Sequence, residues 1–254
     1  MYNDWLKIGP VTVHGYGVMI AIGILAAFWL SEKLARRHGL DAEKMDSFVF
    51  FVIIFGYACS KILYCITVFD QFLSDPFSVL GSGGWVVYGG ILGGILGAYL
   101  YCRTHGWDFI RHLNVLIPCV ALAQGFGRIG CFFAGCCYGI QTDSVIGVSF
   151  PVDSLCPVGH PVIPTQLIMS AGDFLIFFIL MHNLEKGKHP DNTGAMYLIL
   201  YSLGRFLIEF IRGDINRGFV GILSTSQFIA LFVFLAGVLL LMKGKNNLKD
   251  STQV

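Results

Sequence analysis

The sequence predicts an all-α, polytopic membrane protein with seven transmembrane helices. Of its 254 residues, 55% are hydrophobic and only 13% are charged, and the mean hydropathy is +0.70. A soluble domain of this length needs more charge to cover its surface. The apolar residues also come in long blocks such as 48–69, and about 18 or more such residues can cross a hydrocarbon core.

Seven apolar segments fit this class, and we expect them to form a single domain, 1–254. The expected spans are residues 14–33, 46–69, 85–102, 113–135, 163–183, 194–212 and 222–242. The N-terminus lacks the basic region of a cleavable signal peptide, so the first segment is expected to remain as a span. Glycines in 81–97 favour close helix packing or kinks, and the Pro-, Gly- and Ser-rich segment 136–162 is expected to form an outer loop over the site.

Positive charges in the connections predict the orientation. Eleven of the seventeen Lys and Arg residues follow the first, third, fifth or seventh span: Lys33, Arg36, Arg37, Lys44, Arg103, Arg111, Lys186, Lys188, Lys243, Lys245 and Lys249. The other side keeps only Lys7 and Arg217. Because positive loops stay in the cytoplasm, the N-terminus is predicted outside and the C-terminus in the cytoplasm of a bacterial inner membrane.

Four positive residues lie inside or at the edge of spans: Lys61, Arg128, Arg205 and Arg212. Charges at membrane depth are costly and are often functional. Arg128 stands between Gly127 and Gly130, which leave room for a ligand, and arginine binds phosphate oxygens with a bidentate fork. We expect a phospholipid headgroup clamp facing the outer side; the alternative is an arginine that pairs with a carboxylate to hold helices together.

Arg205 and Glu209 form the second candidate. They are four residues apart, so they share one helix face and can form an ion pair. At about 1.5 Å per residue, Arg205 and Arg128 each lie roughly 10 Å inside the outer ends of their spans. We expect the two arginines to bind one phosphate, with Glu209 orienting Arg205; the alternative is that Glu209 only neutralises Arg205.

Further polar residues lie near the expected outer ends of the spans. His14 and Tyr16 open the first span, Tyr88 opens the third and Gln166 opens the fifth. Tyrosines at such positions are more often part of an interfacial aromatic belt, and a glutamine is more often a helix-start or interhelical hydrogen-bond donor. Asp173, in the fifth span, has no partner that the sequence assigns.

Four of the eight cysteines, Cys131, Cys136, Cys137 and Cys156, map to the outer end of the fourth span or the outer loop. A disulfide involving Cys156 fits an oxidising compartment, although spacing does not give connectivity. No His-x-x-x-His pattern completes a metal site, so neither a metal nor another cofactor is expected. The net charge of +1 gives no indication of nucleic-acid binding.

In these residues the chain resembles the bacterial prolipoprotein diacylglyceryl transferases, over nearly its whole length. The matching motifs are Ile8-Gly9-Pro10 with His14-x-Tyr16-Gly17, Gly83-Gly84 with Gly89-Gly90, Gly127-Arg128-x-Gly130 with Gly135 and Gly139, His160-Pro161 with Pro164-x-Gln166, Arg205-Phe206-x-x-Glu209-Phe210-x-Arg212, and Gln227. Each motif alone is weak, but their combined order is specific for the family.

The resemblance implies that the protein transfers a diacylglyceryl group from phosphatidylglycerol to the cysteine thiol of a secreted, lipobox-containing precursor and releases glycerol phosphate. It gives Arg128 and Arg205 the role of headgroup arginines. Tyr16 and Gly139 would line the site, and Glu209 would be the partner of Arg205. We count Arg128, Arg205, Tyr88 and His14 as catalytic candidates; the substrate-binding candidates are Tyr16, Gly127, Gly130, Gly139, Gln166, Glu209, Cys131, Cys136 and Cys137. A monomer is expected.

The chain departs from the family pattern at five positions, two of which are Ile168 and Met169 in place of the usual Tyr-Glu. Tyr88 stands where the family has His, and Cys131 and Cys136 stand where it has Asn and Glu. Two alternatives therefore stay open. In the first, a phospholipid-derived group goes to another acceptor, with Cys131, Cys136 or Cys137 as an internal nucleophile. In the second, the protein binds an anionic phospholipid without catalysis.

Overall fold

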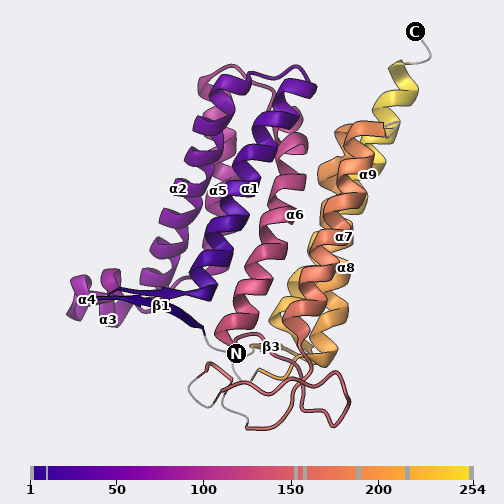
Figure 1. The fold of residues 1–254 in the computed structure, drawn as a ribbon. Coiled ribbons are helices and arrows are strands. Elements are labelled where there is room, and N and C mark those ends of the chain that lie inside the picture. The colour runs from indigo at the N-terminus through magenta and orange to yellow at the C-terminus, as the bar shows by residue number, and fades with distance from the viewer. Residues whose placement is uncertain are drawn as a thin grey trace. The chain divides into compact units, whose positions relative to one another are not determined.

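The computed structural model describes residues 3–9, 11–151, 154–156, 159–186, 190–214 and 218–251. Pro10, Lys188 and Arg217, which belong to the motif and orientation predictions, lie outside these residues, as do parts of the loop 136–162 and the side chains of Lys245 and Lys249. The described chain is mostly helical (Figure 1). Its helices are α1 (Gly15–Arg37), α2 (Ala42–Thr67), α3 (Phe69–Ser74), α4 (Pro76–Gly81), α5 (Val87–Thr104), α6 (Phe109–Ala134), α7 (Thr165–Lys186), α8 (Thr193–Ile208) and α9 (Thr225–Ser251), with 3-10 turns η1 (Pro190–Asn192) and η2 (Glu209–Ile211).

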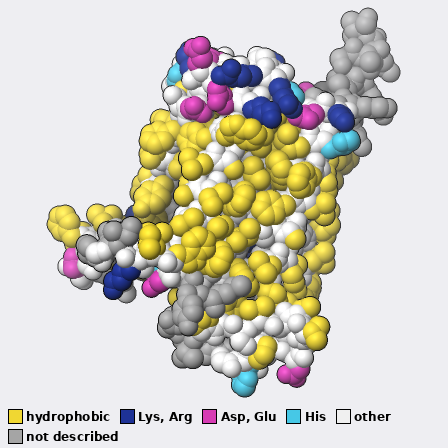
Figure 2. Space-filling model, in the orientation of Figure 1, with side chains coloured by type: hydrophobic (Ala, Val, Ile, Leu, Met, Phe, Trp, Pro, Cys, Tyr) yellow, Lys and Arg dark blue, Asp and Glu magenta, His cyan; other side chains and the backbone are white. Residues whose placement is uncertain are grey.

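Each of the seven predicted spans coincides with a long helix. Six of these helices, α1, α2, α6, α7, α8 with η2, and α9, are long and apolar enough to cross a membrane. The protein is therefore a polytopic membrane protein. In Figure 2 the visible sides of the helices are covered by hydrophobic side chains, and Lys and Arg side chains gather at helix ends. Side chains such as Leu25, Phe178 and Phe232 are more than half exposed, as lipid-facing residues are.

Capping residues set two helix boundaries that hydropathy missed. The Asp41 side chain accepts a hydrogen bond from the Lys44 amide, so α2 begins four residues before the predicted span. Ser224 and Gln227 bind each other's backbone amides at 3.1 Å in a capping box, which starts α9 at Thr225 rather than at residue 222.

The all-α prediction omitted two short hairpins. β1 (Asp4–Ile8) pairs antiparallel with β2 (Val11–His14), and β3 (Phe219–Val220) pairs with β4 (Leu223–Ser224). Positive-φ glycines, Gly9 and Gly221, lie in the two turns. The first hairpin is fixed to the start of α1, because the Asn3 carbonyl accepts from the Gly15 amide at 2.6 Å.

The described residues divide into two compact units, one of residues 1–30 and 114–254 and the other of residues 31–113. In the second unit, the glycines of α5 let it approach α2 very closely. A Cβ atom at Gly89 would lie 2.5 Å from the Cys59 carbonyl, and one at Gly93 would lie 2.4 Å from the Cys59 Cβ. The glycine-rich segment is thus a helix-packing surface, as its composition predicted.

This packing predicts different effects for neighbouring glycines. Gly93→Ala places a methyl group against backbone and Cβ atoms that cannot move easily, so we expect a loss of stability of roughly 1–3 kcal/mol. Gly94→Ala meets only Val52 at 3.7 Å, which is ordinary contact, and should leave stability nearly unchanged. Unfolding of the purified protein in detergent measures both; equal effects would contradict the packing argument.

Lys61, the intramembrane lysine, has a structural role in the second unit. Its buried Nζ donates to the Ser82 carbonyl at 2.8 Å and the Gly84 carbonyl at 3.2 Å. It also lies 4.6 Å from the centre of the Trp85 ring, a cation–π contact. Lys61 therefore fixes the loop that leads into α5.

In the first unit, hydrogen bonds join α6 to α7 and α8. The Ser170 hydroxyl donates to the Gly125 carbonyl at 2.9 Å, and the Tyr197 hydroxyl donates to the Gln124 side chain at 2.6 Å. A buried cluster of Ala121, Leu180 and Tyr197 joins the same three helices. These contacts bring the arginine-bearing ends of α6 and α8 into one region.

Candidate active site

The loop after α6 is held between the ends of α7 and α8. The Gly139 amide donates to the Ile163 carbonyl at 2.9 Å, and the Gly213 amide donates to the Tyr138 carbonyl at 3.0 Å. A Cβ atom at Gly139 would lie 2.7 Å from the Ile163 carbonyl oxygen. Gly139, expected to line the site, is therefore needed for this close backbone approach.

Two polar side chains at the start of α7 fix the tight turn 135–137. Gly135 and Cys137 have φ of 76° and 59°, and Cys137 is the only non-glycine with positive φ among the described residues. The Thr165 hydroxyl donates to the Cys137 carbonyl, and the Gln166 amide donates to the Cys136 carbonyl, each at 2.7 Å. Gln166, a predicted substrate-binding residue, is fully buried. Its hydrogen bond to the Cys136 carbonyl holds the loop.

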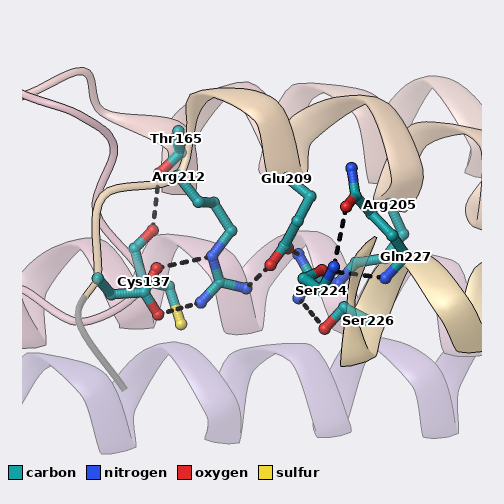
Figure 3. Close-up of polar contacts among 9 residues, drawn as sticks. Cys137, Thr165, Arg205, Glu209, Arg212, Ser224, Ser226 and Gln227 are labelled. Carbon is teal, nitrogen blue, oxygen red and sulfur yellow. Dashed lines mark hydrogen bonds and ion pairs between the residues drawn. The ribbon is translucent and has the colours of Figure 1, made fainter. Parts of the chain in front are cut away.

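At the end of α8 and in the turn that follows it, the Glu209 side chain lies between those of Arg205 and Arg212 (Figure 3). The Glu209 carboxylate lies 2.8 Å from Arg205 and 3.8 Å from Arg212, and all three side chains are largely buried. Arg205 also donates to the Ser226 hydroxyl at 2.7 Å. The predicted Arg205–Glu209 ion pair is present, and Glu209 joins two arginines rather than one.

Arg212 has a second carboxylate partner, Asp214, to which its Nε donates at 2.8 Å. The Arg212 guanidinium thus has two carboxylate neighbours, Glu209 and Asp214, which favour its charged form. Sequence reasoning missed Asp214 because it lies beyond the end of the span, although its spacing of two from Arg212 could have indicated a contact.

Arg128, on α6, differs from the other two arginines. Within the part of the chain that the structure describes, its guanidinium forms no hydrogen bond or ion pair. Its charge interacts with that of Arg205, with the carboxyl of Asp173 and with the Tyr201 hydroxyl. The two arginines thus lie within electrostatic range of each other, and no hydrogen bond among the described residues occupies the donors of Arg128.

A cavity of about 300 Å³ lies between α7 and α8. Its wall is largely apolar, as at Ile168, Ile176 and Leu207, and it also includes Arg205 and Asp173. The buried Oδ2 atom of Asp173 has no hydrogen-bond partner among the described residues. A mostly apolar cavity with a few charged groups is typical of a ligand site, and the combination suits an amphiphile with an anionic head.

Two glycines shape the surroundings of Arg128. A Cβ atom at Gly127 would have no neighbour within 4 Å, so the backbone there is open to a ligand. At Gly130 a Cβ atom would lie 3.1 Å from the Tyr16 carbonyl oxygen. Gly130 therefore allows α1 to cross α6 closely and places Tyr16 beside the site.

Cys131, Cys136 and Cys137 come together, with all three Sγ atoms within 4.8 Å of one another. Their thiols are partly buried and near the charges of Arg128 and Arg212. Hydrogen bonding from the Cys131 and Cys136 thiols, helped by these two arginines, lowers the pKa of the Cys137 thiol, and the same hydrogen bonding raises that of Cys136. All eight cysteines are described and none forms a disulfide, so the bond considered for Cys156 is not present.

His14 has a carboxylate partner that sequence reasoning did not find. Its Nδ1 lies 2.7 Å from Asp4 Oδ1, because the first hairpin pairs these two residues across its strands. No hydrogen bond to Nε2 of the ring is found within the described residues. The alternation of polar and apolar residues around Gly9 could have indicated this hairpin. Tyr88, another catalytic candidate, lies at the start of α5 in the second unit and is 41% exposed.

A family model described as prolipoprotein diacylglyceryl transferase matches residues 4–243 of the chain. The chain belongs to this family. Among curated relatives, phosphatidylglycerol–prolipoprotein diacylglyceryl transferase 2 of Clostridium perfringens is 43% identical over 236 residues, which cover 92% of each chain. The corresponding transferase of Clostridium tetani is 42% identical over 89% of this chain and 91% of its own. That of Clostridioides difficile is 31% identical over 94% and 96%.

Membership of the prolipoprotein diacylglyceryl transferase family confirms the resemblance inferred from the motifs. The relatives are bacterial enzymes, and with six candidate spans the chain is a multi-pass transferase of this kind. The match also covers the segments that carry Tyr88, Cys131 and Cys136. The match also includes Arg128 and Arg205.

Proposed function

We propose that this protein transfers the diacylglyceryl group of phosphatidylglycerol to the cysteine thiol of a prolipoprotein and releases glycerol phosphate. The relatives' names give both substrates. The observation that carries the proposal in this chain is that Arg128 lies within electrostatic range of Arg205, and that Arg205 lines a largely apolar cavity. An anionic lipid head with apolar chains fits both parts.

We place the protein in the bacterial cytoplasmic membrane as a monomer with seven spans, including α5. The N-terminus is outside, the C-terminus is in the cytoplasm and the site opens to the outer face. The distribution of Lys and Arg supports this orientation. A secreted precursor emerges on that side of the membrane, so the acceptor thiol and the donor lipid can meet there.

The reaction is a displacement at a glycerol carbon of the lipid. The acceptor sulfur forms a bond to the glycerol carbon that carries the phosphate ester, and the carbon–oxygen bond breaks. Glycerol phosphate leaves with the electron pair, so its phosphate gains a second negative charge. We assign Arg128 and Arg205 to the phosphate, because cations fixed in a low-dielectric site stabilise charge that develops in the transition state. Glu209 orients Arg205.

We assign His14 as the base that takes the thiol proton, with Asp4 as a positioning residue. The Asp4–His14 hydrogen bond supports this choice, because a carboxylate on one ring nitrogen fixes the tautomer that leaves the other nitrogen as acceptor. Tyr16 and Gly127 adjoin the phosphate region, and Tyr88 remains the alternative base.

Asp4→Asn tests the positioning role. We expect kcat to fall by about 10-fold, a fraction of the 10²–10⁴-fold that general base catalysis supplies, with little change in KM. Asp4→Glu should restore part of the rate, and Asp4→Asn should have no further effect in a His14→Gln background. Asp70→Asn, a change of an exposed acid in the other unit, is the control. Equal losses with and without His14 would contradict the pairing.

Transfer is tested directly with purified protein in micelles that contain phosphatidylglycerol and a peptide with a lipobox cysteine. The peptide mass should rise by one diacylglyceryl group, with one glycerol phosphate released per modified peptide. A peptide with serine in place of the cysteine should remain unmodified.

The alternatives give different results in the same assay. Release of glycerol phosphate without peptide modification would overturn the proposed acceptor, and a lipid adduct on the protein itself, abolished by Cys137→Ser, would indicate the internal nucleophile. Lipid binding without any release would indicate the non-catalytic alternative.

A further inference from the structure

We propose that Cys131, Cys136 and Cys137 bind a zinc ion whose fourth coordination position receives the acceptor thiol. The binding of the acceptor thiol rests on the proposed function. The binding of zinc does not, because it is argued from the three thiols and the residues around them.

The spacing of the three sulfurs suits one ion. Two sulfurs at about 2.3 Å from a tetrahedral zinc ion lie about 3.8 Å from each other. The three Sγ atoms lie within 4.8 Å of one another, at most about 1 Å beyond that spacing. A set of sulfur ligands selects thiophilic ions such as zinc over magnesium or calcium.

The turn that carries two of the cysteines is rigid and specifically supported. Cys137 adopts a left-handed φ that is rare outside glycine, and buried Thr165 and Gln166 hold the carbonyls of Cys137 and Cys136. Such outer contacts orient metal ligands and are part of a metal site's affinity. Strained backbone that is fixed in this way is a feature of functional sites.

Charge balance also favours the complex. Three thiolates and one Zn²⁺ carry a net charge of −1, which would be costly to bury alone. Arg128 and Arg212 lie within electrostatic range of Cys137, and neighbouring guanidinium groups stabilise thiolates. A disulfide would use only two of the three sulfurs and leave the third unexplained.

Three protein ligands leave one position open, which is the pattern of catalytic rather than structural zinc sites. A thiol that coordinates such an ion loses its proton and becomes a nucleophile. The acceptor S–H would release its proton to His14 and its sulfur would form the bond to the glycerol carbon as glycerol phosphate leaves. The thioether product would be a weaker ligand than the thiolate and would leave the open position. This assigns a function to the cysteines that replace the family's usual residues.

Metal binding is tested first, without turnover. The full-length, reduced protein in detergent is stripped with a chelator and titrated with Co²⁺ or Cd²⁺. We expect one ion per chain and a thiolate-to-metal charge-transfer band. Each single Cys→Ser change at 131, 136 or 137 should weaken binding by at least about 10-fold, whereas Cys156→Ser, outside the cluster, should not.

Thr165→Val keeps every thiol and removes the hydroxyl that holds the Cys137 carbonyl. It should weaken Co²⁺ binding by about 10–100-fold, and it serves if a cysteine variant does not fold. No charge-transfer band in the wild type, or the same band in all cysteine variants, would overturn the metal site.

The open position is tested by adding the lipobox peptide to the Co²⁺-loaded protein. The charge-transfer band should grow by roughly one third as a fourth thiolate joins three, and the serine peptide should cause no change. If the intensity of the charge-transfer band does not change when the cysteine peptide is added, the open position does not bind the acceptor thiol.

The two proposals can fail separately. Unchanged peptide lipidation by chelator-stripped protein would reject the role of the ion and leave the transferase standing. A charge-transfer band that grows with the peptide, without any lipidation of that peptide, would support the metal site and reject the transferase activity.

Discussion

Replacing Arg128 by alanine is expected to lower kcat by about 10²–10³-fold, the usual cost of removing a fixed donor that stabilises transition-state charge. The donor lipid's phosphate carries one negative charge and the departing glycerol phosphate carries two, so the need for a cation increases as the carbon–oxygen bond breaks. Arg128, which has no protein partner among the described residues, can meet that need. Release of glycerol phosphate from vesicles of phosphatidylglycerol in the presence of the lipobox peptide measures the effect.

Arg128→Lys distinguishes the geometry of the group from its charge. Lysine keeps the charge but loses the bidentate fork, so we expect most of the loss to remain. Arg103→Lys is the matched control, because Arg103 lies at the end of α5 and donates to Tyr99. A higher KM with unchanged kcat would mean that Arg128 binds the ground state and transition state equally, which contradicts its assigned role.

The helices and the arginines of the site could be predicted from sequence for the same physical reason. Apolar segments long enough to span a bilayer leave few alternatives to helix, and a charge within such a segment is too costly to be incidental. Arg128 and Arg205 were singled out in this way, and Glu209 by its spacing of four residues from Arg205. Lys61 satisfied the same criterion, but its carbonyl and cation–π contacts are structural. Sequence could not distinguish it from the arginines, because hydropathy shows that a buried charge is costly and does not show which contacts offset the cost.

The cysteine cluster and the Asp4–His14 pair depend on local backbone geometry that spacing does not reveal. Cys131 lies on α6, and Cys137 returns to it only through the left-handed turn that buried Thr165 and Gln166 stabilise from another helix. Asp4 meets His14 through the register of a hairpin that begins outside any span. Predicting such contacts requires knowing where a distant segment of the chain lies, whereas a membrane-spanning helix can be predicted from its own residues.

Glu209→Gln is expected to destabilise the protein by about 3–5 kcal/mol, the cost of breaking a buried ion pair by removing one partner. The Glu209 side chain is 2% exposed, and those of Arg205 and Arg212 are 16% and 9% exposed, so solvent cannot replace the lost carboxylate. Thermal unfolding in detergent measures the loss. Arg205 has no second carboxylate partner within the described residues, whereas Arg212 keeps Asp214.

Because Arg212 has two carboxylate neighbours and Arg205 has one among the described residues, the two arginines provide controls for this prediction. Asp214→Asn should cost less, because Asp214 is 23% exposed and Arg212 retains Glu209. Arg205→Gln in the Glu209→Gln background should recover part of the stability, since it removes the uncompensated charge, while activity stays lost because the phosphate has lost a cation. If the double variant is no more stable than Glu209→Gln alone, the carboxylate acts through packing and not through charge, and its role in holding Arg205 for the phosphate must be abandoned.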